Sequence, residues 1–296
     1  MRKGLGGKVF DCLNIVGMLL LAAVMLYPYL NQIAISFNEG MDTAFGGITI
    51  FPRRFTLENY RAIFNNDMII NATFVTVITV IAATLLGLVI CLSAAYALQK
   101  KGMPMRNFLI WFLLIPMYIT PGLIPILILY RYLGLLNNIF VYILPGAFSF
   151  FNTLIIRSYL KGLPKGLEEA ALIDGANEIT VLFRVIVPLC MPVLATVALW
   201  LSVGAWNDWT TTLYFVNDRN LFRLQFVIMQ IIQQSEIVQR MAAEAAMTGT
   251  APLEARPTSE TVKAAAIIFS TIPIIMVYPF LQRYFVKGVT IGAIKE

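Results

Sequence analysis

Six long apolar stretches constrain this sequence more than any other feature. Each is long enough to cross a bilayer as a helix, which takes about 20 mostly apolar residues. They contain no Asp, Glu, Lys, Arg or His, and they cover residues 12–37, 68–99, 107–130, 137–156, 186–206 and 264–282. The sequence therefore predicts an all-α membrane protein with six transmembrane helices.

The composition supports this class and excludes several others. Hydrophobic residues make up 59% of the chain and charged residues 13%, against about 45–50% and about 25% in soluble domains. We therefore exclude an ordinary soluble enzyme, a disordered chain and a nucleic-acid binder. The chain has no histidine, and Cys12, Cys91 and Cys190 lie in or beside apolar runs without metal-ligand spacing. We expect no metal or cofactor on this chain.

The charged residues are divided unequally between the two sides of the predicted membrane. One side takes the N-terminus 1–11, the loop 100–106, the loop 157–185 and the chain beyond residue 282. It holds 13 of the 22 basic and 6 of the 16 acidic residues, which gives net charges of +7 there and −1 on the other side. By the positive-inside rule, both termini are expected in the cytoplasm. The basic excess thus indicates orientation rather than a nucleic-acid partner.

The first stretch must be distinguished from a signal peptide, because Arg2, Lys3 and Lys8 precede it. Its apolar run is too long for a signal-peptide core, and no A-x-A site follows it. We expect an uncleaved first helix at 12–37.

The domain order follows from this topology. An extracellular segment is expected at 38–67, and a transmembrane core at 68–286. The core contains the cytoplasmic loop 157–185 and the extracellular loop 207–262, and a cytoplasmic tail at 287–296 ends the chain.

Two further patterns concern the shape of this core. In the extracellular loop, helix-like spacing covers 221–247 and a flexible connection follows at 248–261. Prolines in the third and fourth stretches break backbone hydrogen bonds and predict bent helices, either around a central space or as kinks without a role. These prolines are Pro116, Pro121, Pro125 and Pro145.

The absence of charge from the six stretches limits the mechanism. Proton- or ion-coupled carriers usually place ionisable groups within their spans, and intramembrane hydrolases need a nucleophile with an acid or base partner. The remaining polar groups, such as Thr76 and Thr79, either hydrogen-bond between helices or line a polar path. A transported solute would then be neutral and polar, with its energy supplied by another subunit. A stand-alone secondary transporter remains a less favoured alternative.

The cytoplasmic segment 163–192 predicts two short helices at an angle. Pro164 suits a first helical turn, and Glu168 and Glu169 favour the positive end of that helix dipole. Gly175 suits a left-handed turn, and Asn177 can cap the next helix. The hairpin either receives another protein on its small side chains, Ala170 and Ala171, or is a surface hairpin without a partner.

This segment resembles the EAA motif of ABC importer permeases. The family pattern is E-A-A-x3-G-x9-I-x-L-P, and here Glu169-Ala170-Ala171, Gly175 and Val185-Ile186-Val187-Pro188 match its spacing, with valines for the Ile and Leu. The run EAALIDGA and the ending GVTIGAIKE are similar to MalG-type subunits of carbohydrate importers. The runs ISFNEGMDTAFGGITIFPRRFT and LQFVIMQII resemble the LplC/YtcP-like subgroup.

The resemblance implies a type I ABC importer permease in the cytoplasmic membrane of a bacterium. Its partners would be a second permease subunit, two ATPase subunits that carry ATP and Mg, and an extracellular binding protein that delivers a sugar or oligosaccharide. Part of the loop 207–262, around 236–261, would contact that binding protein. The residues assigned to ATPase coupling are Glu169, Ala170, Ala171, Asp174 and Gly175, and the tail with Gly292 and Lys295 would reach the ATPase interface.

The chain itself carries no G-x-x-x-x-G-K-[ST] loop and is therefore not expected to be the ATPase. An importer permease for a non-sugar solute, such as a peptide or an amino acid, is the main alternative within this family.

Overall fold

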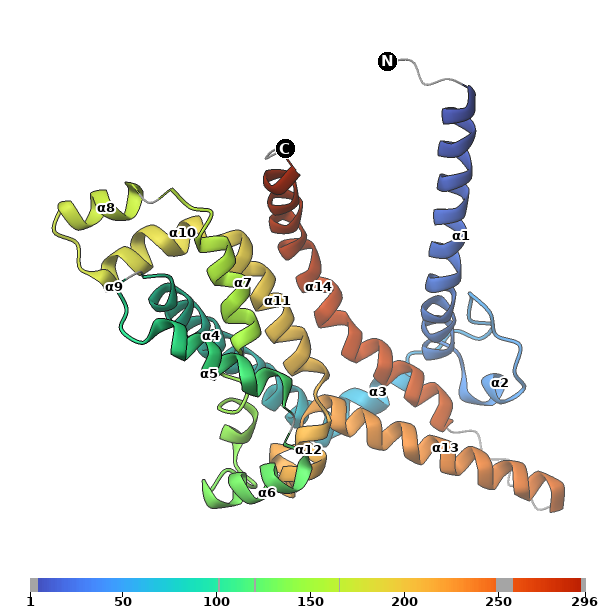
Figure 1. Ribbon diagram of the computed structural model, residues 1–296. Helices are drawn as coiled ribbons and strands as arrows, with labels where there is room; N and C mark the ends of the chain where they lie inside the picture. The colour runs from blue at the N-terminus through green and yellow to red at the C-terminus, as the bar shows by residue number, and fades with distance from the viewer. Residues whose placement is uncertain (1–4, 101, 120, 165, 249–257, 294–296) are drawn as a thin grey trace. The chain divides into compact units, whose positions relative to one another are not determined.

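The computed structural model describes residues 5–100, 102–119, 121–164, 166–248 and 258–293, and within these ranges the chain is helical without a named strand. The longest helices are α1 (Leu5–Ser36), α4 (Asp67–Gln99), α13 (Leu224–Thr248) and α14 (Ser259–Ala293) (Figure 1). The prediction of an all-α chain is confirmed. The shorter elements are α2 (Gly40–Ala44), α3 (Glu58–Phe64), α5 (Arg106–Tyr118), α6 (Leu123–Tyr132), η1 (Ile139–Tyr142), α7 (Phe150–Leu160), α8 (Gly166–Ile173), α9 (Glu178–Thr180), η2 (Val181–Ile186), α10 (Val187–Leu189), α11 (Met191–Asn207), α12 (Thr210–Phe215) and η3 (Arg219–Leu221).

Three helices of the described chain are long and apolar enough to cross a membrane: Gly6–Ser36, Asp67–Gln99 and Ser259–Val277. Two further candidates are bent pairs. In one, α5 and α6 meet at 119°, and in the other, Glu178–Leu189 meets Met191–Asn207 at 85°. The structure therefore supports three to five spans, and the sixth remains a prediction.

The structure differs from the six predicted spans at residues 137–156, where the sequence predicts one continuous helix. The structure instead has the 3-10 turn η1 and the separate helix α7, and α7 has 11 residues. At 1.5 Å per residue α7 covers about 16 Å, which is shorter than the hydrocarbon core. Pro145 and Gly146 lie between the two elements, and the Ser149 hydroxyl caps α7 by accepting from the Asn152 N–H. The apolar content of the sequence does not by itself predict such a break in a helix.

Proline accompanies both bends. Pro121 and Gly122 separate α5 from α6, and Gly122 has a φ of +81°. At the second bend, Cys190 separates α10 from α11, and Pro192 lies in the first turn of α11. Proline lacks the N–H that continues a helix, so the chain changes direction beside it. The predicted bending of the third stretch is confirmed.

The chain divides into two compact units. The first unit comprises the described residues up to Ile69 and from Ile228 to Ile272. In it, the apolar body of α1 is exposed along most of its length, as for Val24 at 71%. Such a surface is typical of a helix that faces lipid or another protein.

The end of α1 is held by the segment that follows it. Asn31 Nδ2 donates to the Ile48 carbonyl at 2.8 Å, and Asn59 Nδ2 donates to the Ser36 and Asn38 carbonyls at 3.0 and 2.9 Å. Asn38 and Asn59 are both buried. Residues 38–67 thus form an ordered fold built on buried amides rather than a loose connection.

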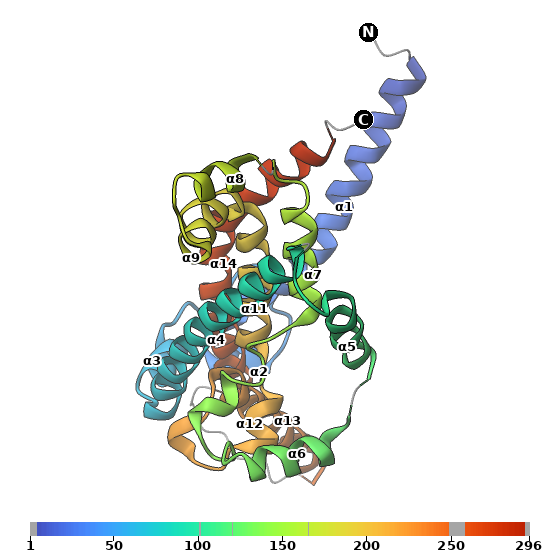
Figure 2. The ribbon, with the colours of Figure 1, turned by 60° about the vertical axis from the view of Figure 1, so that its left-hand side comes forward.

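The second unit comprises the described residues from Ile70 to Val227 and from Pro273 onward. Its core joins α4, α7, η2 and α11 through the buried side chains Cys91, Ile156, Leu160, Val181 and Val197. In both ribbon views, α8 and α9 lie at one end of this unit and α6 and α12 at the other (Figures 1 and 2). Helix α4 connects these two ends.

Candidate functional site

The hairpin at 163–192 is built from α8 and the run α9–η2–α10, as predicted. Helix α8 ends in a Schellman motif, in which the Ala176 N–H donates to the Ala171 carbonyl and the Gly175 N–H to the Leu172 carbonyl, both at 3.0 Å. Gly175 has a φ of +84°, a left-handed conformation that favours glycine. The predicted turn at Gly175 is confirmed.

The second arm begins at a capped helix end. Asn177 Oδ1 accepts from the Thr180 N–H at 2.8 Å, as its predicted capping role requires. The chain then continues through the π-helix η2, whose Val181 and Leu182 are buried in the core of the second unit. This arm fixes the hairpin to the helices of the core.

A basic side chain at the end of α4 joins the two arms. Lys100 Nζ donates to Oε1 of Glu168 on α8 and to Oε1 and Oε2 of Glu178 on α9, the latter two at 3.0 and 2.7 Å. The Tyr96 hydroxyl lies 2.6 Å from Glu178 Oε2 and 3.1 Å from Glu168 Oε1. We call Tyr96, Lys100, Glu168 and Glu178 the clamp.

The hydrogen bonds of the clamp stabilise the charged forms of Lys100 and Glu178. Burial lowers the pKa of Lys100, but the bonds to Glu168 and Glu178 outweigh it, so the pKa lies above its ordinary value. Hydrogen bonds from Lys100 and Tyr96 hold the pKa of Glu178 below its ordinary value. At neutral pH the lysine is therefore protonated and Glu178 ionised, the state that joins the two arms to α4.

The residues assigned to coupling are divided between the surface and the core. Glu169, Ala170, Asp174 and Gly175 are exposed, whereas Ala171 is half-buried and packs against the core of the second unit. One apolar side chain beside them, Ile173, is 86% exposed. A small, partly apolar surface held by a rigid clamp is suited to receiving another protein.

Sequence reasoning missed the clamp. It assigned Lys100 only to the charge asymmetry of the two membrane sides, and Glu168 only to a helix dipole. The bonds of Lys100 join residues 68 and 78 positions apart, and no local pattern marks such a pair. Only the packing of α4 against the hairpin brings them together.

The structure says less of the other assigned residues. Gly292 lies in the last turns of α14, and Lys295 lies outside the described residues. The helix predicted at 221–247 is confirmed as α13. Most of the predicted connection at 248–261 lies outside the described residues, because the structure describes nothing between 249 and 257.

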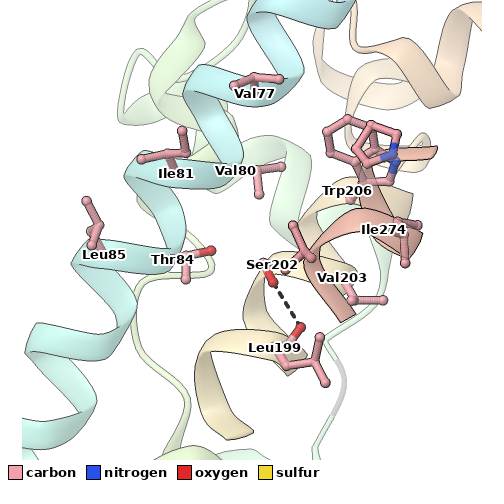
Figure 3. A pocket seen from close by; sticks show the side chains of 12 residues that line it. Val77, Val80, Ile81, Thr84, Leu85, Leu199, Ser202, Val203, Trp206 and Ile274 are labelled. Atoms are coloured by element: carbon pink, nitrogen blue, oxygen red, sulfur yellow. Dashed lines mark hydrogen bonds between the residues drawn. The ribbon is translucent and has the colours of Figure 1, made fainter. Parts of the chain in front are cut away.

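A groove of about 400 Å³ lies between α4, α11 and α14 in the second unit (Figure 3). Its walls are mostly apolar, and the Ser202 hydroxyl on one wall donates within its own helix to the Leu199 carbonyl at 3.1 Å. This groove suits an apolar group and offers little to a polar solute.

The chain is similar to known transport proteins over its whole length. Protein LplC of Bacillus subtilis is 36% identical over 295 residues, which is 100% of this chain and 98% of that protein. The polygalacturonan/rhamnogalacturonan transport system permease protein YtcP of the same organism is 31% identical over 97% of this chain and 99% of its own length.

A solved structure is similar at the level of the fold as well. It is a bacterial ABC transporter involved in the import of the acidic polysaccharide alginate. Its matching chain is 27% identical, with a TM-score of 0.85 over 96% of this chain and 99% of that one. The described helices thus have the fold of a subunit of an ABC importer.

The family that matches the sequence is described as "Binding-protein-dependent transport system inner membrane component", and it matches residues 87–291. This range contains the hairpin, the clamp residues and both bent helix pairs. The apolar helices agree with a multi-pass protein of the cytoplasmic membrane. The chain belongs to the family of inner-membrane components of binding-protein-dependent transport systems.

Proposed function

We propose that this chain is a permease subunit of an ATP-driven importer that moves a sugar or oligosaccharide delivered by an extracellular binding protein. The observation that carries the proposal is full-length similarity to YtcP, named for polygalacturonan and rhamnogalacturonan transport, together with similarity to a transporter that imports alginate. Both are named for saccharides built from sugar rings with many hydroxyl groups.

The proposed topology has six spans and cytoplasmic termini. Three long apolar helices of the structure support three of these spans, and each of the two bent pairs would form one more. The sixth, at 137–156, would combine η1 and α7 across the break at Pro145. The net charges of +7 and −1 on the two sides support the orientation.

In this proposal, α8 is the contact through which ATPase closure reaches the membrane helices. Glu169, Ala170 and Asp174 lie on the exposed surface of the hairpin, where an ATPase subunit would bind. The clamp would transmit the movement, because Lys100 ties the hairpin to α4. The complex would contain a second permease subunit and two ATPase subunits with ATP and Mg.

Labelling of introduced cysteines tests topology. In a chain whose three cysteines are replaced, Ile173→Cys and Tyr132→Cys place thiols at positions whose native side chains are 86% and 87% exposed. A membrane-impermeant maleimide should label Tyr132→Cys in intact cells and Ile173→Cys only after the membrane is opened. Labelling of Ile173→Cys in intact cells would contradict the proposed orientation.

Cross-linking tests the ATPase contact in the assembled complex. Ala170→Cys should cross-link to an ATPase subunit with a short bifunctional reagent, and the yield should change when ATP is added. Phe45→Cys, at a position 82% exposed in the proposed extracellular segment, is the matched control and should give no such product. Equal yields from the two positions would argue against α8 as the contact.

The loop 207–262 is proposed to contact the binding protein through its part around 236–261. Replacing residues 249–257, which lie between the end of α13 and the start of α14, with a short Gly/Ser linker should preserve expression and basal ATP hydrolysis. It should weaken docking or sugar release, since such a linker offers no shaped contact surface. Unchanged affinity for the binding protein, together with unchanged uptake at limiting sugar, would assign the loop to a simple connection.

A further inference from the structure

A second cavity of the second unit has mostly apolar walls that also carry several polar groups. Its volume is about 340 Å³, within the roughly 300–1,000 Å³ typical of small-molecule sites. Three aromatic side chains and three polar ones line it: Tyr130, Tyr142, Trp200, Asp208, Thr211 and Arg223. Aromatic walls with a few placed polar groups are the usual make-up of a ligand site.

Arg223 is the most constrained of these residues. Its side chain is 2% exposed. Nη1 donates to Asp208 Oδ2 and Nε to Thr79 Oγ1, each at 3.2 Å, and the guanidinium carbon lies 4.6 Å from the centre of the Tyr142 ring. The guanidinium is therefore fixed by α4, η1 and the residue that follows α11.

The remaining nitrogen of this guanidinium is unsatisfied. Nη2 is buried and has no hydrogen-bond partner among the described residues. Buried polar groups are nearly always bonded, and an exception is expected to have a reason. Arg223 lines the cavity, but Nη2 itself has no exposed surface, so an oxygen atom of a bound molecule satisfies this donor only when the guanidinium turns toward the cavity.

The charges of Asp208 and Arg223 determine whether a carboxylate oxygen or a hydroxyl oxygen is favoured in the cavity. Asp208 already neutralises Arg223, so a carboxylate in the cavity would place a second negative charge beside Asp208. A hydroxyl accepts the same hydrogen bond without that repulsion. Trp200 lines the cavity and is 45% exposed, and an aromatic ring can pack against the apolar C–H side of a sugar ring.

We propose that this cavity binds one uncharged sugar ring of the transported saccharide, with a ring hydroxyl accepting from Arg223 Nη2 and Trp200 packing on the ring face. The inference rests on the proposed function. Asp208 and Arg223 lie in the predicted extracellular loop, so the site is at the end of the unit where the binding protein would deliver its sugar.

The glycine Gly204 allows a test that leaves the Arg223 contacts intact. It lines the cavity, and a Cβ at this position would meet no atom within 4 Å. Gly204→Leu should therefore add a side chain at the cavity wall whose Cβ has free space around it. Val203→Leu is the matched control, because Val203 precedes it on α11 and lines the apolar groove (Figure 3).

Uptake is measured with the complete transporter in proteoliposomes. The probes are maltotriose, arabinotriose, trigalacturonate and the methyl ester of trigalacturonate. For whichever probe wild type imports, Gly204→Leu should lower the saccharide moved per ATP by about tenfold or more, as a misplaced ligand does. Val203→Leu should stay within about twofold of wild type.

The outcomes separate the site from the function. If wild type imports a probe and Gly204→Leu imports it equally well, the proposed site is wrong. The proposed function is not affected by that result. Import of a peptide or an amino acid by wild type, in place of every saccharide, would contradict the proposed function, and the site with it. If the free acid is imported but its neutral ester is not, the assignment of an uncharged ring is wrong.

A labelling measurement covers the case in which Gly204→Leu fails to assemble. Gly204→Cys, in the chain without other cysteines, presents a small thiol to the cavity. The imported saccharide should slow its reaction with a maleimide, whereas the same saccharide should not protect Val203→Cys. Equal labelling rates with and without saccharide would overturn the site.

Discussion

The ammonium of Lys100 lies 2.7 Å from Oε2 of Glu178, a residue 78 positions further along the chain. Lys100 also bonds Glu168, so a single side chain at the end of α4 holds both arms of the hairpin. A displacement of the hairpin would therefore act directly on the end of α4. The same helix reaches Arg223 through Thr79, 21 residues earlier, a distance of about 30 Å along the helix.

Removing the clamp ammonium should separate the hairpin from α4. Lys100→Met leaves the carboxylate of Glu168, 18% exposed, without its cation, which should cost about 1–2 kcal/mol of stability. Thermal unfolding in detergent measures this loss. In proteoliposomes, ATP hydrolysis should continue while less sugar is moved per ATP.

Lys161→Met is the matched control for this variant. Lys161 is exposed at the end of α7 and forms no ion pair within the described part of the chain, so its loss should change neither quantity. Lys100→Arg should restore part of the coupling. Wild-type coupling in Lys100→Met would show that the clamp only fixes the loop.

The pH dependence of the clamp follows from the direction of its two pKa shifts. Glu178 has a lowered pKa, so its contribution to stability is complete above its ordinary value of 4.5 and is lost as the pH falls below it. Lys100 has a raised pKa, so its contribution is complete below its ordinary value of 10.5 and is lost only at higher pH.

The stability difference between wild type and Glu178→Gln should therefore be constant from about pH 6 to 9 and shrink in acid. Unfolding midpoints of both proteins at each pH measure it. A difference that already falls between pH 8 and 6 would exclude the Lys100–Glu178 pair as its source.

The loss of transport caused by a substitution at Gly175 should increase with the energy that the new residue needs to adopt the left-handed conformation. Asn is tolerated there, Ala costs about 1 kcal/mol and a β-branched residue more. Transport per ATP should decline in the order Gly175→Asn, Gly175→Ala, Gly175→Val. No atom lies within 4 Å of an added Cβ, so the effect would come from the backbone.

Gly166→Ala is the control for this series. Gly166 lies at the start of the same helix, has no positive φ and has equal space around an added Cβ. Its substitution should leave transport unchanged. The ranking would be refuted by a Gly175→Val variant that transports as well as Gly166→Ala.

The C-terminal tail is proposed to reach the ATPase interface. Deleting residues 288–296 removes Gly292 and Lys295, and it should lower the ATPase activity stimulated by the loaded binding protein. Insertion into the membrane should be unaffected, since the deletion lies beyond the last apolar stretch. Undiminished stimulation would assign these residues to a frayed terminus.

Local features of the hairpin could be predicted from the sequence. Gly175 and Asn177 have their conformations because of their own chemistry, a missing Cβ and a short side-chain acceptor. The sequence around Gly175 therefore predicts both the turn and the cap without reference to packing.

Long-range features could not be predicted in the same way. The bond between Lys100 and Glu178, and the burial of Arg223 beside Tyr142, depend on helices that meet only in the folded chain. At 137–156 the apolar content indicated a helix, but Pro145 and the cap at Ser149 divide it. Hydropathy measures whether a segment is apolar enough for lipid. It does not predict where a proline or a cap interrupts the helix.

The central claim is that this chain imports a saccharide only as part of an ATP-driven complex. The direct test is uptake of labelled saccharide by proteoliposomes that contain this chain, a second permease subunit, the ATPase subunits and a loaded binding protein. The account predicts uptake that requires ATP, the binding protein and an intact Glu169. Uptake by this chain alone without ATP, or transport of a peptide or amino acid in place of every saccharide, would contradict it.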